Sequence, residues 1–160
     1  GLVPLPAIAQ NAAAEGRVLA DAVTGLNPAQ VRGMISTGDA AAGRGDLTAA
    51  RASYDQARET ANLLVGFYRD LGGSFRGLDA RIPREMNSKG REALELRAEA
   101  NLRLAALFRR QNLPEMAVPV LVEVIKLVTP AQPKGRKAYQ SLVELGFVET
   151  EFKATSPAGS

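Results

Sequence analysis

The sequence predicts an all-α protein of five to six helices arranged as antiparallel hairpins. Ala and Leu dominate its apolar residues, and such small or unbranched side chains favour helices. Apolar positions recur at intervals of three and four, and Gly, Pro, Asn or Asp separate the periodic segments. At 160 residues the chain can bury one core, so we expect a single domain over residues 1–153 and a tail at 154–160.

The N-terminal residues 1–9 are mostly apolar and predict an arm that packs on the domain or on a partner. Ala7-Ile8-Ala9 has the small-x-small form of a signal-peptidase site, so the alternative is the remnant of an export or thylakoid-transfer signal. A processed start predicts an organellar or exported compartment, with the thylakoid lumen as one candidate. No run of about 18 apolar residues occurs, so no transmembrane segment is expected.

The first half of the chain predicts three helices. An Ala-rich segment predicts the first from Pro6 to about Ala22, and Asn27 caps the second, from Pro28 to about Ala42. Asp46 caps a long amphipathic third helix that ends at a pair of glycines. An irregular loop is expected over 72–84, with three apolar residues that contact the core: Phe75, Leu78 and Ile82.

The second half predicts three more helices. One runs from Glu85 or Ser88 to Gln111, and the last from Arg136 to Leu145. Between them, the segment from Glu115 to Val128 is apolar nearly all round, which predicts a central helix that Pro119 bends. Because this segment is also rich in β-branched residues, a strand is the alternative.

The segment from Val31 to Leu64 has the most regular pattern, with a glycine turn between two helices and small residues where they must touch: Gly38, Gly45, Asp46, Ala50, Tyr54 and Ala57. It resembles the tetratricopeptide (TPR) repeat, whose hairpin has Gly-Asp at the turn and Ala-x3-aromatic-x2-Ala in its second helix. Ala117 corresponds to Ala50 in a looser second copy, at an offset of 67 residues or two periods of about 34.

The resemblance covers about half the chain, because residues 65–97 occupy the place of a middle repeat without its pattern. It implies a degenerate, right-handed TPR-like array, and an up-and-down helical bundle is the alternative. TPR arrays hold a peptide or helix on a concave wall, lined mainly by the first helix of each hairpin. The positions implied for that wall are Arg32, Ile35, Asp39, Leu102, Arg103, Ala106, Arg109 and Arg110.

The composition argues against several functions. Without Cys or His the chain lacks the commonest metal ligands and the commonest general base, so we expect no metal, no cofactor and no enzyme activity. A net charge of +3 with interspersed acids is too mild for a nucleic-acid-binding protein.

We therefore expect a non-catalytic protein-interaction scaffold, or an accessory or assembly subunit of a larger complex. Its protein partner could be acidic, because arginine binds carboxylates with two parallel hydrogen bonds. An organellar or photosynthetic membrane assembly is one setting. The alternative is a soluble peptide-binding adaptor with an arginine-lined groove.

Overall fold

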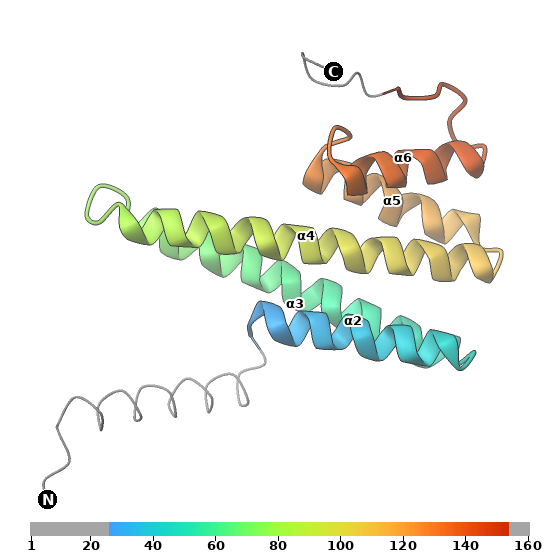
Figure 1. The fold of residues 1–160 in the computed structure, drawn as a ribbon, viewed down its shortest axis with the longest axis horizontal. Coiled ribbons are helices and arrows are strands. Elements are labelled where there is room, and N and C mark those ends of the chain that lie inside the picture. Colours follow the sequence, from blue (N-terminus) through green and yellow to red (C-terminus); the bar gives the residue numbers. More distant parts are fainter. Residues whose placement is uncertain (1–25, 154–160) are drawn as a thin grey trace, which may run out of the picture.

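The computed structural model describes residues 26–153, and every regular element in that range is helical. Within this range five helices follow one another through short turns (Figure 1): α2 (Pro28–Gly43), α3 (Leu47–Ser74), α4 (Arg81–Arg110), α5 (Pro114–Val128) and α6 (Pro133–Glu144). The predicted all-α class is confirmed, and the strand alternative for the α5 segment is wrong. The expected helix at Pro6–Ala22, the arm at 1–9 and the tail at 154–160 lie outside the described residues.

The predicted caps and turn of the first hairpin are confirmed. The Asn27 side chain accepts a hydrogen bond from the backbone N–H of Gln30 at 2.9 Å, and Asp46 accepts one from Ala49 at 3.1 Å. Each cap satisfies a backbone donor that the first turn of a helix leaves without a partner. Between α2 and α3, Gly45 has a φ of +79°, a left-handed conformation that suits glycine.

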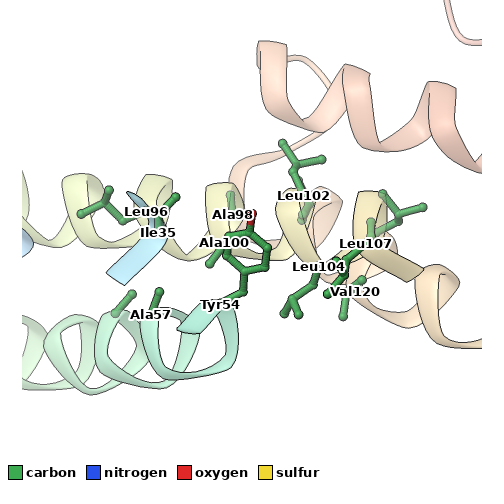
Figure 2. Close-up of a cluster of buried hydrophobic side chains, with 14 of the residues drawn as sticks. Ile35, Tyr54, Ala57, Leu96, Ala98, Ala100, Leu102, Leu104, Leu107 and Val120 are labelled. Carbon is green, nitrogen blue, oxygen red and sulfur yellow. The ribbon is translucent and has the colours of Figure 1, made fainter. Parts of the chain in front are cut away.

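The central helix is α4, which contacts all four other described helices. In the second half of α4, residues that are adjacent in the sequence point to different sides of the helix and are nevertheless buried. Other parts of the protein therefore surround this half of the helix. Figure 2 shows Tyr54 of α3 pointing toward Ala98 and Ala100 of α4 within this core. The prediction that α5 is central was wrong. Not all of its apolar side chains face the interior of the protein, and Val122 is 37% exposed.

The expected irregular loop at 72–84 is mostly helix, because only residues 75–80 separate α3 from α4. The expectation that Phe75 and Leu78 contact the core was wrong, since both are exposed. Gly72 does not end α3; it is buried where the helices meet, and a Cβ there would lie 3.2 Å from Cβ of Met86. Pro83 is the third residue of α4. Backbone N–H groups in the first turn of a helix have no partner within the helix, so a proline there removes no helical hydrogen bond.

The α3/α4 pair forms a long hairpin that includes the segment lacking the repeat pattern. Residues 65–97 belong to the end of α3 and the beginning of α4. In Figure 1, α2 lies alongside the first half of α3 only, so the far half of the hairpin extends beyond the N-terminal end of α2. This far half has no described helix in the place that α2 takes along the near half.

The packing of α2 on α3 predicts the effect of a single methyl group. A Cβ at Gly38 would lie 2.4 Å from Cε1 of the buried Tyr54 ring. We expect Gly38→Ala to lower the free energy of unfolding by about 1–3 kcal/mol through overpacking, although alanine is the better helix former. Urea denaturation followed by circular dichroism measures this change.

Gly33→Ala is the matched control on the same helix. An added Cβ at Gly33 meets nothing within 4 Å, so the substitution should raise the free energy of unfolding by about 0.5–1 kcal/mol. Equal changes in the two variants would contradict the close contact between α2 and α3.

Candidate interaction site

Two of the expected groove residues are part of the core. Ile35 of α2 and Leu102 of α4 are both buried. Sequence periodicity places them correctly on the inner sides of their helices, but those sides face other helices and not a ligand. The structure therefore leaves Ala106 and the polar members of the expected groove available at the surface.

Asp39 connects α2 to both α3 and α4. One of its carboxylate oxygens accepts a hydrogen bond from the Tyr54 hydroxyl at 2.6 Å and another from Nε of Arg103 at 3.0 Å. Arg103 also pairs with Glu99 at 2.8 Å. Burial raises the pKa of Tyr54, and its hydrogen bond to the Asp39 carboxylate raises that pKa further, so the hydroxyl stays protonated.

The other expected arginines also bind groups within the chain. Arg109 pairs with Glu144 of α6 at 2.8 Å, and Arg110 donates to the backbone carbonyl of Ala42 at 3.0 Å. Arg32 of α2 pairs with Glu92 of α4. All these pairs join different helices, so the arginines contribute to helix packing.

Four of the expected residues do meet, at a hollow between α4, α5 and α6. Its volume is about 150 Å³, and its lining combines them with residues from α5 and α6: Leu102, Arg103, Ala106, Arg109, Leu121, Lys137 and Ser141. Pockets that hold small molecules have volumes of about 300–1,000 Å³. This hollow is smaller than that range, and Arg109, which lines it, is paired with Glu144.

A polar cluster between α3, α4 and α5 was missed at the sequence level. Asn101 is fully buried and donates to Glu123 at 2.6 Å, while Arg97 pairs with the same carboxylate and with Asn62. Arg58 of α3 lies 3.9 Å from Glu123. The sequence carried one sign of this cluster, since Asn101 interrupts the apolar side of its helix.

An exposed apolar surface on α3 was also missed. We define the α3 stripe as Leu63, Phe67 and Leu71, which are 51%, 47% and 49% exposed. They are spaced by four residues and therefore lie along one side of the helix. All three lie in the second half of α3. Periodicity in the sequence identified the buried side of α3, and this second apolar side adjoins it.

The described residues contain no group of three or more acidic side chains that could hold a metal ion. Among the helices between residues 26 and 153, none combines the length and the apolar content needed to cross a membrane.

Comparisons with protein-family models, with curated proteins and with solved structures give no match to this chain. The resemblance to the TPR repeat therefore stays a prediction.

The hydrogen bond between Tyr54 and Asp39 predicts that the stability of the protein depends on pH in the alkaline range. Tyrosines of the unfolded chain lose their protons above about pH 10, whereas Tyr54 keeps its proton in the folded state. The contribution of Tyr54 to stability is therefore fully present below that pH and declines above it. We expect the urea midpoint of the wild type to fall more steeply above about pH 10 than that of Tyr54→Phe.

At neutral pH, Tyr54→Phe should lower the free energy of unfolding by about 1 kcal/mol, because the Asp39 carboxylate loses one donor. The comparison with the wild type also cancels the other tyrosine whose pKa is raised, Tyr68. Parallel pH profiles for the two proteins would show that Tyr54 titrates as it does in the unfolded chain.

The cluster around Glu123 predicts a large effect of removing one carboxylate. Glu123→Ala removes the carboxylate that pairs with Arg97 and accepts from Asn101, and we expect a loss of about 2–3 kcal/mol in the free energy of unfolding. Thermal and urea unfolding measure it. On the same helix, the exposed Glu115→Ala should cost less than about 1 kcal/mol. Similar losses would mean that the cluster adds no stability.

Proposed function

We propose that this chain is a non-catalytic protein-interaction scaffold, which packs as a subunit on a helix of a protein partner. The observation that carries the proposal is the α3 stripe. It exposes three large apolar side chains side by side on one helix, and contiguous exposed apolar patches on folded proteins commonly mark interaction sites. A permanent partner would remove these side chains from water.

The shape of the stripe suits a helix as the partner element. Side chains at intervals of four residues form a ridge, and helices pack by fitting such ridges into grooves of the neighbouring helix. The near half of α3 already packs against one helix, α2, and the far half lacks such a neighbour among the described residues. An amphipathic helix of a partner would occupy that place.

The packing order of the helices is compatible with a TPR-like array, which supports a scaffold role. Consecutive helices contact each other, and α4 also contacts both α2 and α6. In a TPR-like array, the first helices of successive hairpins are neighbours in the same way. Under this proposal α2/α3 and α4/α5 are the two hairpins and α6 covers the end. A membrane-associated complex is one setting that we propose for the partner.

The alternative function, a peptide-binding adaptor with an arginine-lined groove, is supported less well. Arg103 and Arg109 bind carboxylates of the chain itself. An acidic peptide would have to displace those carboxylates, and the hollow beside the arginines is small. The adaptor requires these pairs to open, whereas the scaffold uses a surface that is already exposed.

The proposal predicts that the α3 stripe determines partner binding. The tagged protein, expressed in its source cells, should recover a protein in fixed stoichiometry, and the double variant Phe67→Asp/Leu71→Asp should lose it. Quantitative mass spectrometry of the purified complexes measures this ratio. Because both side chains are about half exposed, the variant should keep the wild-type melting temperature and helical circular dichroism signal.

Two further variants separate the alternatives. Gln56→Asp places a charge on an exposed position of α3 two turns before the stripe and on the same side of the helix, and it should retain the partner. Arg109→Glu should also retain the partner. If the protein were instead an adaptor with an arginine-lined groove, Arg109→Glu would be the one variant of the three that loses the ligand. A partner recovered equally by the stripe variant and the wild type would overturn the proposed scaffold surface.

A further inference from the structure

The tip of the α3/α4 hairpin exposes apolar side chains at one end of the molecule. We define the hairpin tip as residues 75–84, the loop after α3 and the first turn of α4. Leu78 is 79% exposed, the most of any large apolar residue described, and Phe75 is exposed as well. Figure 1 shows this loop at the far end of the hairpin, away from α5 and α6. The tip is therefore convex and accessible to a flat surface.

The residues around this tip carry a net positive charge. Residues 63–91 contain six Arg or Lys and three Asp or Glu, an excess of three. Each of the three acids pairs with a neighbouring base: Asp70 with Arg69, Asp79 with Arg81, and Glu85 with Lys89. Within residues 26–153, the remaining three bases have no ion-pair partner: Arg76, Arg84 and Arg91.

The backbone of the tip is largely hydrogen-bonded within itself. The N–H groups of Leu78 and Asp79 both donate to the carbonyl of Phe75, at 3.0 and 3.2 Å. The N–H of Arg81 donates to the Asp79 side chain at 3.0 Å, and that of Ile82 to the Asp79 carbonyl at 3.3 Å. A segment with few unpaired donors can enter a water-poor layer at low cost, because unpaired backbone groups are what such a layer penalises most.

We propose that the hairpin tip docks on the surface of a membrane that contains anionic lipids. Phe75 and Leu78 would enter the boundary between headgroups and acyl chains, while Arg76 and Arg84 contact lipid phosphates. Apolar side chains inserted next to basic residues are the combination by which peripheral proteins bind anionic bilayers. Guanidinium groups also suit phosphate, which they bind through two parallel hydrogen bonds.

A membrane fits this surface better than an acidic protein does. The most exposed apolar residue, Leu78, lies on a convex loop, where a protein partner would need a matching cavity. A bilayer needs no such complementarity, because its headgroups rearrange around an inserted side chain. This inference goes beyond the proposed scaffold function, since it concerns the tip and leaves the α3 stripe to a protein partner.

Vesicle sedimentation with the full chain tests the proposal. The wild type should sediment with vesicles of phosphatidylcholine and phosphatidylglycerol, and much less with vesicles of phosphatidylcholine alone. Arg76→Gln/Arg84→Gln should lower the partition coefficient about 25-fold, at about fivefold per arginine. Phe75→Ser/Leu78→Ser should lower it at least about tenfold. Added salt should weaken binding of the wild type, because it screens exposed charges.

A matched control removes the same charge elsewhere. Arg44 and Lys126 are exposed and lie outside the tip, so Arg44→Gln/Lys126→Gln should sediment like the wild type. Equal binding by all variants, or no preference for phosphatidylglycerol, would overturn the membrane proposal. Loss of the protein partner by the tip variants with no vesicle binding would overturn it in favour of an acidic protein. The stripe variant Phe67→Asp/Leu71→Asp should still bind vesicles, which separates this test from that of the scaffold.

Discussion

The structure depends on the enclosure of α4 by the helices around it. Four alanines on α4 are buried and let the neighbouring helices approach closely: Ala93, Ala98, Ala100 and Ala105. At the margins of this enclosed segment, three arginines spaced by six residues each reach a different helix. Arg97 pairs with Glu123 of α5, Arg103 with Asp39 of α2, and Arg109 with Glu144 of α6. Burial holds the helices together, while these pairs specify how each one is placed against α4.

This division of roles shapes what the surface can do. Most arginines of the expected groove are paired with carboxylates of the protein itself, and a partly buried charge that loses its partner is costly. An exposed apolar surface lies at the far half of the α3/α4 hairpin, where no described helix continues the position of α2. Under the proposals above, other molecules bind at this far half, whereas α2, α5 and α6 pack around the near half.

Local patterns in the sequence predicted the helices and their caps. Asn27 and Asp46 cap the helices that directly follow them, and Gly45 forms the turn at its own position. Predictions that depend on distant neighbours fared differently. Gly72 looked like a helix end, yet its lack of a side chain serves the approach of Met86 from the next helix. Ile35 and Leu102 looked like groove residues because periodicity gives the side of a helix but not what that side faces. The exposed stripe on α3 depends on where α2 begins in space, which no local pattern encodes.

One consequence of α4 concerns geometry over a long range. Its 30 residues form one uninterrupted helix, about 45 Å long at the usual rise per residue. Because this helix is continuous, it holds a molecule bound at the hairpin tip at a fixed distance and angle from α5 and α6. Inserting whole turns into both arms of the hairpin would change that distance and keep the direction. Inserting a single residue would rotate the tip by about 100° about the helix axis, so the number of residues in α4 sets the orientation of one end relative to the other.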